Sequence, residues 1–328
     1  MISMSITKSK VVLFWSTFDA DVDSSFGLWR DKKIELSPFH YLPLLSHVRL
    51  RNNVTLYTYQ NIEASYEQEN IFEGIELRDA DEVFPARYAY VALTNGHSIA
   101  HVSDAVRLKV ASVCNGIVLD SDAVALREFP LSDESGWFAS MPAKATGGFA
   151  PQWGKAHPPL TIHDMSWNGR ALSAFPIKVN EITKGAIEKL SNKIMVNLAR
   201  TPSGSSKGWN YILWTIKDIV KMDSRLKTYE PVTFCPVPSW LLAGKCYSLE
   251  SPTRLNGDTV LFGYRLPTID AIMNNSITIQ HFFESAFQDA SRVGCDFWDS
   301  VNGDSLVGIE ADFILGSNWR QILREYVR

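Results

Sequence analysis

The chain has 328 residues, with 32 Lys and Arg against 36 Asp and Glu, a net charge of −4, and 45% hydrophobic residues. This balance is typical of a globular protein with a substantial core and excludes a disordered or collagen-like chain. The near-neutral charge gives no general electrostatic reason to bind nucleic acid or an anionic membrane.

The four cysteines are scattered and form no CxxC pair, so the sequence predicts neither a zinc ribbon nor a redox motif. The first apolar run, residues 11–15, is too short for a signal peptide, and no stretch approaches the roughly 18 apolar residues of a membrane span. We therefore expect a cytoplasmic protein without a membrane span.

In chain order, apolar runs and turn signals predict strands that alternate with helices. The expected strands are residues 11–15, 54–59, 117–119, 232–237 and 259–264. The expected helices are residues 38–47, a helix from Ser103 to the Asn115–Gly116 turn, 180–198, 209–222, 276–290 and a short basic helix within 309–328. Such alternation predicts an α/β fold, a mixed central sheet flanked by helices, as a single domain over residues 1–328.

Two carboxylates directly follow one of these apolar strands. Asp120 and Asp122 come straight after residues 117–119, and ligands bind at the carboxyl ends of strands in open α/β sheets. Two aspartates one residue apart repel each other unless a positive group lies between them, and a divalent cation with oxygen ligands is the economical answer. The alternative is that one aspartate caps the next segment while the other is solvated.

The helix upstream adds two further polar residues. Asp104 and Arg107 are three residues apart, so they share one helix face. Because a tight turn joins this helix to the strand and runs the two antiparallel, the sequence predicts that both residues converge on Asp120 and Asp122. The alternative is a local Asp–Arg pair that stabilises the fold by well under ~1 kcal/mol.

The run from Ser103 to Asp122 resembles the signature of the DxD-containing retaining glycosyltransferases, which share the GT-A fold. This family includes capsular-polysaccharide transferases, Golgi mannosyltransferases and large glucosylating toxins. Asn115 stands where the family has the first glycine of a Gly-Gly turn, and asparagine tolerates left-handed geometry. Weaker similarities are a strand ending in Trp15, the acidic segment 79–85, Asn168 and the segment 316–319.

The resemblance implies a role for each matching residue. Asp104 and Arg107 would hold donor-sugar hydroxyls, and Asp120 would bridge ribose and sugar. Asp122, with Asp120, would bind Mn²⁺ or Mg²⁺. The remaining implied residues are Trp15 on the nucleobase, Asn168 at the donor, Ser317 and Trp319 at the diphosphate, and Asp312, preferred over Glu310, as a further metal ligand.

The resemblance also implies the reaction. A UDP-sugar, or a GDP-sugar, would give its sugar to a glycan or another hydroxyl acceptor with retention at the anomeric carbon. Residues 1–130 would form the nucleotide-sugar-binding half, and residues 131–328 the acceptor-binding and closing half. No carboxylate is clearly placed as a covalent nucleophile, so we expect the acceptor to attack beside the leaving group.

Two other functions stay open. The run from Asp120 to Val124 fits the D-x-D-x-[TV] pattern of haloacid-dehalogenase-like, Mg²⁺-dependent phosphatases. However, about a third of the chain precedes it, and Asp304 and Asp312 are too far apart for the later acidic pair that such enzymes need. A non-catalytic carbohydrate-binding protein would use the 12% aromatic residues as platforms. The glycine-rich segment 203–208 lacks the spacing of a phosphate-binding loop, so we expect a loop that covers the donor.

Overall fold

The computed structural model describes the chain in segments, and every structural statement here concerns these residues. They are residues 9–36, 38–66, 70–129, 136–142, 166–167, 170–202, 223, 225–229, 231–234, 236–237, 255–261, 264–280, 298 and 301–326. The predicted helix over residues 209–222 and the segment 203–208 lie outside them. No helix in the described part of the chain is long and apolar enough to cross a membrane.

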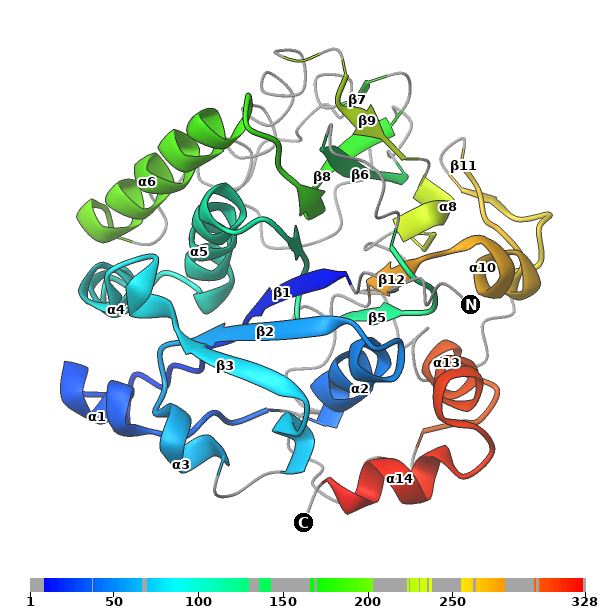
Figure 1. The fold of residues 1–328 in the computed structure, drawn as a ribbon, viewed down its shortest axis with the longest axis horizontal. Coiled ribbons are helices and arrows are strands. Elements are labelled where there is room, and N and C mark those ends of the chain that lie inside the picture. Colours follow the sequence, from blue (N-terminus) through cyan, green and yellow to red (C-terminus); the bar gives the residue numbers. More distant parts are fainter. Residues whose placement is uncertain are drawn as a thin grey trace, which may run out of the picture.

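The structure alternates strands and helices, as the sequence predicts (Figure 1). The strands are β1 Lys10–Phe14, β2 Asn53–Thr58, β3 Ile75–Asp79, β4 Ile117–Val118, β5 Ala123–Ala125, β6 Trp137–Pro142, β7 Ser166–Trp167, β8 Arg170–Lys178, β9 Lys227–Thr228, β10 Val260–Leu261, β11 Tyr264–Arg265 and β12 Thr278–Gln280. The α-helices are α1 Phe26–Asp31, α2 Tyr41–Arg49, α3 Ile62–Tyr66, α4 Ala86–Thr94, α5 Ile99–Val113, α6 Lys184–Arg200, α8 Pro231–Phe234, α10 Ile269–Asn275, α13 Leu306–Leu315 and α14 Trp319–Glu325. Short 3-10 helices are η1 Pro38–His40, η2 Asn70–Phe72 and η3 Ala80–Glu82.

The central sheet has a parallel part and a mixed part. Its order is β3-β2-β1-β4-β8-β6-β9, with β7 paired to β8. The four strands from β3 to β4 run parallel to one another, and β8 is antiparallel to both β4 and β6. The parallel strands follow the order 3-2-1-4 of a nucleotide-binding α/β sheet. This architecture confirms the predicted mixed α/β sheet flanked by helices and is consistent with the GT-A-like fold.

Strand β1 separates two hydrophobic cores because successive side chains of a strand point to opposite faces. Val11 and Leu13 pack into one core with α2, α13 and α14, whereas Val12 and Phe14 pack into the other with α4, α5 and α6. Figure 1 shows these two groups of helices on opposite sides of the sheet. Burial on both faces explains why the strand reads as a continuous apolar run rather than an alternating one.

Several predicted elements need correction. Helix α5 begins at Ile99, and its N-cap is Ser98, whose Oγ accepts a hydrogen bond from the amide of Ala100, so Ser103 lies inside the helix. The expected strand over residues 232–237 begins instead as the short helix α8, and the expected helix over 276–290 begins as strand β12. A short apolar run is compatible with a helix or a strand, and in both places packing against distant segments determines which one forms.

The acidic segment before α4 also contains a strand, β3, that its composition does not predict. Strand β3 pairs with β2 in parallel, and its first three residues are alternately buried and exposed. Two helices, α13 and α14, replace the one short basic helix expected near the C-terminus. Gly316, with a φ of 83°, separates them, because a left-handed residue ends an α-helix.

Candidate active site at the carboxyl edge of the parallel strands

The Asp120–Asp122 pair lies on a tight turn between two strands. The amide of Leu119 donates to the carbonyl of Val12 at 3.1 Å, which extends the pairing of β4 with β1 up to the turn. The amide of Ala123 then donates to the carbonyl of Asp120 at 3.2 Å and closes the turn. Both carboxylates therefore leave the sheet at the carboxyl edge, where ligands bind in open α/β folds.

The turn that precedes β4 depends on a glycine for a different reason than expected. Neither Asn115 nor Gly116 has a positive φ among the described residues, so left-handed geometry is not what this turn needs. A Cβ at Gly116 would lie 3.1 Å from the carbonyl oxygen of Lys10, so glycine lets the chain pass close against β1.

Helix α2 holds the far side of the Asp120–Asp122 turn. Nε2 of His47 donates to the carbonyl of Ala123 at 3.2 Å, and Oγ of Ser46 accepts from the amide of Ala125 at 2.9 Å. Strand β5 also pairs antiparallel with β12. The residue that follows Asp122 is thus fixed by a buried imidazole and by a strand about 150 residues later in the chain.

Burial keeps this imidazole neutral. His47 is completely buried, and removal from water lowers its pKa to about 4, although its hydrogen bond to Ala123 acts in the opposite direction. Because a carbonyl only accepts, Nε2 carries the proton, and Nδ1 has no hydrogen-bond partner in the described part of the chain. The ring stacks on Phe129 with a centroid distance of 6.1 Å.

Arg107 joins the helix to the DxD turn. Its Nη2 contacts Oδ1 of Asp104 at 2.8 Å on the same helix face, and its Nη1 forms an ion pair with Oδ1 of Asp120. Asp104 and Arg107 are buried and Asp120 is nearly so. The structure therefore brings together Asp104, Arg107 and Asp120, as the spacing and the antiparallel turn predict. With α5 starting at Ile99, the pair lies in the middle of the helix rather than near its N-terminus.

The cluster places three carboxylates near one guanidinium. Arg107 faces the carboxylates of Asp104 and Asp120, and Asp122 follows two residues further on. Carboxylates held at low exposure need a cation or hydrogen-bond donors beside them. Their oxygens accept hydrogen bonds from hydroxyl groups and bind hard cations, so such ligands fit the chemistry of these side chains.

A divalent cation fits the chemistry of these side chains. Asp122 is half-buried on the turn, and hard cations such as Mg²⁺ often bind one or two carboxylates and complete their shell with water and substrate phosphates. No group of three His, Cys, Asp or Glu residues that could hold a metal by itself occurs among the described residues. Asp122 and Asp120 would hold such an ion together with a phosphate-bearing ligand.

Trp15 follows β1 at the same edge. Its amide donates to the carbonyl of Tyr57 at 2.9 Å, so it continues the pairing of β1 with β2. Its indole Nε1 donates to the carbonyl of Glu35 at 2.9 Å, and its ring lies against His40 with a centroid distance of 3.9 Å. The ring is half-buried and held at two points, which gives a fixed aromatic surface beside the turn.

The C-terminal residues named by the resemblance lie on α13, on α14 and in the turn between them. Asp312 and Ser317 are exposed, whereas Glu310 is completely buried. Trp319 is 3% exposed, with Trp298 packed edge-on against it and the guanidinium of Arg320 over its ring at 4.3 Å. Trp319 and Trp15 contribute to the same hydrophobic core, so the two ends of the chain meet on one face of the sheet. Asn168 lies outside the described residues.

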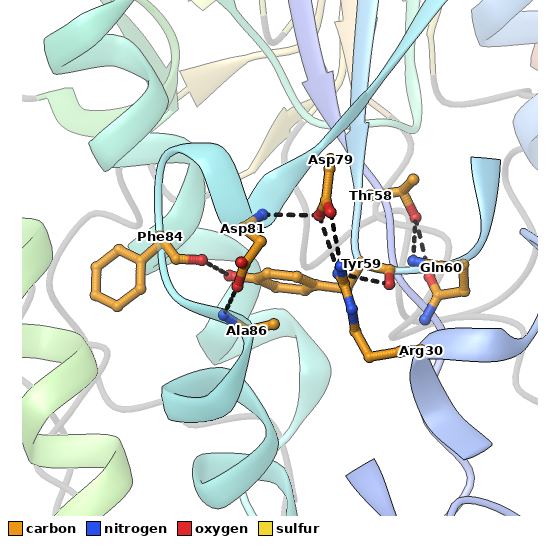
Figure 2. A network of polar contacts seen from close by, with 8 residues as sticks. All are labelled: Arg30, Thr58, Tyr59, Gln60, Asp79, Asp81, Phe84 and Ala86. Carbon is orange, nitrogen blue, oxygen red and sulfur yellow. Dashed lines mark hydrogen bonds and ion pairs between the residues drawn. The ribbon is translucent and has the colours of Figure 1, made fainter. Parts of the chain in front are cut away.

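A second Arg–Asp site, which sequence reasoning missed, lies at the ends of β2 and β3 (Figure 2). Arg30 binds both carboxylate oxygens of Asp79, at 2.9 and 2.6 Å, and donates to the carbonyl of Tyr59 at 2.8 Å. The amide of Asp81 donates to Asp79 at 2.9 Å, and Asp81 in turn accepts from the amide of Ala86. These bonds fasten the acidic segment to the sheet and start α4.

A cleft of about 330 Å³ opens beside this network. Its lining includes Arg30, Gln60, Asn61 and Asp79. The Gln60 side chain donates to the carbonyl of Thr17 at 3.2 Å, which connects the cleft to the loop that follows Trp15. The only signal in the sequence was Asp79 within the acidic segment, because Arg30 is 49 residues away.

Comparisons with known proteins give only weak likenesses in structure. No family model matches the sequence, and no curated protein matches it. Among solved structures, the chain is similar to the PaToxG glycosyltransferase, with 16% sequence identity over 66% of this chain and 72% of that chain and a TM-score of 0.38. A likeness this weak carries no functional argument, so any assignment of activity rests on the site itself.

Proposed function

We propose that the chain is a metal-dependent, retaining glycosyltransferase that uses a nucleotide-sugar donor, with a UDP-sugar preferred over a GDP-sugar. One observation carries the proposal. Asp104 and Arg107 of α5 meet Asp120 of the DxD turn at the carboxyl edge of four parallel strands. This is the constellation that the sequence resemblance assigns to donor binding, and it forms here from two separate elements.

The residues of the cluster have distinct roles in the proposed reaction. The carboxylates of Asp104 and Asp120 accept hydrogen bonds from hydroxyls of the donor sugar and ribose. Arg107 lies between them, orients both, and keeps their charges from repelling each other. Trp15 stacks on the nucleobase, because its half-buried ring is fixed at the same edge. Mn²⁺ or Mg²⁺ bound at Asp122 and Asp120 would supply positive charge for the diphosphate leaving group.

The proposed transfer exchanges one bond for another at the anomeric carbon. The bond from C1 to the diphosphate oxygen breaks, an acceptor hydroxyl oxygen bonds to C1 on the same face, and the hydroxyl proton leaves with the diphosphate. Because negative charge develops on the departing diphosphate, groups arranged in advance to receive that charge supply the largest catalytic contribution.

The phosphatase alternative requires a different role for Asp120. In that mechanism Asp120 would attack phosphorus, yet its carboxylate is ion-paired with Arg107, which stabilises its negative charge and reduces its nucleophilicity. This pairing favours hydrogen bonding to a sugar over attack on phosphorus.

The test is nucleotide release. The protein is incubated with Mn²⁺ and a panel of UDP- and GDP-sugars, and released UDP or GDP is measured with and without glycan acceptors. We expect release from at least one donor and a loss of at least about 100-fold in Asp104→Asn. The matched control Asp258→Asn, at an exposed residue in the loop before β10, should release nucleotide as the native chain does. No release from any donor, together with no thermal shift by any of them, would contradict the proposal. Release of inorganic phosphate from a sugar phosphate would favour the phosphatase instead.

A further inference from the structure

A second pocket lies at the opposite edge of the sheet from the candidate active site. It has a volume of about 560 Å³ and opens at the amino ends of β1, β2 and β3. Its lining consists of Lys10, Val48, Arg51, Asn52, Asn53, Val54, Thr55, Gly74 and Glu76. The five residues of β1 span about 16 Å, so this pocket is separate from the carboxyl edge that carries the DxD turn.

Two cations stand at this pocket without ion-pair partners among the described residues. They are Lys10, at the start of β1, and Arg51, between α2 and β2. The opposite side holds Glu76, whose carboxylate accepts a hydrogen bond from Thr55 at 3.0 Å. The pocket therefore carries a net positive charge next to a hydrogen-bond acceptor.

The backbone at Arg51 gives this cation a defined place. Arg51 has a φ of 57° and is the only non-glycine residue with a positive φ in the described part of the chain. Its amide donates to the carbonyl of Val48 at 2.9 Å, and the amide of Asn52 donates to the carbonyl of His47 at 3.1 Å, which ends α2. Glycine adopts this conformation without strain and is the usual residue at such a helix end, so arginine here brings a charge at a conformational cost.

The wall of the pocket contains a hydrogen-bond donor that the protein leaves unused. Asn52 is 8% exposed, and its side-chain Nδ2 has no hydrogen-bond partner among the described residues. A buried amide without a partner is unfavourable, and most such groups in proteins are satisfied. Asn52 lines the same pocket as Lys10 and Arg51, so a bound ligand with acceptor oxygens would give this amide a partner.

We propose that this pocket binds a small phosphorylated sugar, of the size of a hexose phosphate. The phosphate would contact Lys10 and Arg51, and the sugar hydroxyls would meet Asn52, Asn53 and the carboxylate of Glu76. The volume lies within the range of small-molecule sites and is far larger than a phosphate ion needs. The single carboxylate favours a ligand that offers hydroxyl donors as well as an anion. The proposal is independent of the activity proposed for the other edge.

The test measures binding of glucose 6-phosphate to the full chain by isothermal titration calorimetry. Glucose and inorganic phosphate serve as partial ligands, and we expect each to bind at least about tenfold more weakly than glucose 6-phosphate. Lys10→Gln is expected to weaken binding about tenfold, because it removes one charged contact. Arg49→Gln is the matched control: this arginine is exposed on α2 but does not line the pocket.

Arg51→Gly separates binding from folding. Glycine removes the charge and relaxes the left-handed backbone, so the melting temperature should stay the same or rise while binding weakens at least about tenfold. Unchanged affinity in Arg51→Gly would overturn the proposal. Loss of binding in Asp104→Asn, with the melting temperature retained, would also overturn it, because the probe would then occupy the donor site. Equal affinity for inorganic phosphate would overturn the sugar part of the proposal.

Discussion

Two arginine–aspartate sites lie at the same edge of the sheet and differ in exposure and in the number of carboxylates paired with the arginine. In the first, Arg107 pairs with both Asp104 and Asp120, and the three side chains are 8%, 7% and 16% exposed. In the second, Arg30 binds a single carboxylate, that of Asp79, through two hydrogen bonds, and these side chains are 23% and 37% exposed.

In the Arg30 site, the guanidinium and the carboxylate already satisfy each other. The hydrogen bonds with Asp79 raise the pKa of Arg30. Partial burial alone would raise the pKa of Asp79, but the hydrogen bonds from Arg30 and the Asp81 amide outweigh it and hold the pKa below its usual value. The Arg107 site places two carboxylates beside one guanidinium at low exposure. The same residue pair thus fastens the fold at one place and, in the proposed function, takes part in donor binding at another.

The largest expected effect comes from breaking the buried site. Arg107→Met leaves Asp104 and Asp120 without their shared cation, so we expect the free energy of unfolding to fall by about 3–5 kcal/mol at pH 7. Urea unfolding monitored by tryptophan fluorescence measures it. Adding Asp104→Asn to this variant removes one of the two carboxylate charges and should restore part of the loss. A fall below about 1 kcal/mol in Arg107→Met would mean that solvent or other groups already compensate these carboxylates.

The next effect concerns pH and the helix that holds the DxD turn. His47 has a pKa of about 4 in the fold, against about 6.5 in the unfolded chain, so the unfolded state binds the extra proton between these values. The neutral imidazole therefore makes its full contribution to the free energy of unfolding above pH 6.5. As the pH falls toward 4, the free energy of unfolding decreases by up to about 3 kcal/mol.

The measurement compares urea unfolding of the native chain and His47→Gln at pH 7.0 and 4.5. Glutamine keeps an amide donor for the carbonyl of Ala123 but does not titrate, so the variant should lose less stability on acidification than the native chain. Identical pH dependence of the two proteins would show that His47 titrates in the fold as it does in the unfolded chain.

The smallest effect is expected at the Arg30 site. Arg30→Met should lower the free energy of unfolding by about 1–2 kcal/mol, because solvent reaches Asp79 and compensates much of the lost pairing. The exposed pair between Arg78 and Glu82 is the control, and Arg78→Gln should change stability by less than about 0.5 kcal/mol. Nucleotide release by Arg30→Met should stay close to that of the native chain. A loss as large as that of Arg107→Met would remove the distinction between the two sites.

Much of the first half of the fold could be predicted from the sequence because the decisive signals are local. Strand β1 is a buried apolar run, and the spacing of Asp104 and Arg107 together with the short turn before β4 predicts their approach to Asp120. The Arg30–Asp79 pair joins residues 49 apart, and no periodicity links them.

The roles expected near the C-terminus show where local patterns stop being informative. A tryptophan after a Gly-Ser-Asn turn reads the same whether its ring faces a ligand or the core, and packing against Trp298 determines that Trp319 is buried. The identities of α8 and β12 also depend on distant partners: the amide of Ile277 donates to the carbonyl of Thr233 at 2.6 Å. A role for Asp312 at a metal stays a prediction.

Because β5 pairs with β12, the structure of the DxD turn depends on a strand far along the chain. Before residues 278–280 have been synthesised, the edge of Ala123–Ala125 has no strand beside it, and the amide of Leu126 lacks the carbonyl of Ile277 that it binds at 2.8 Å. Contacts between such distant segments form slowly because a long loop must close first. During synthesis, the aspartate pair would therefore reach its final geometry only after most of the protein has emerged, and a fragment ending at residue 130 would carry the motif without the strand that holds it.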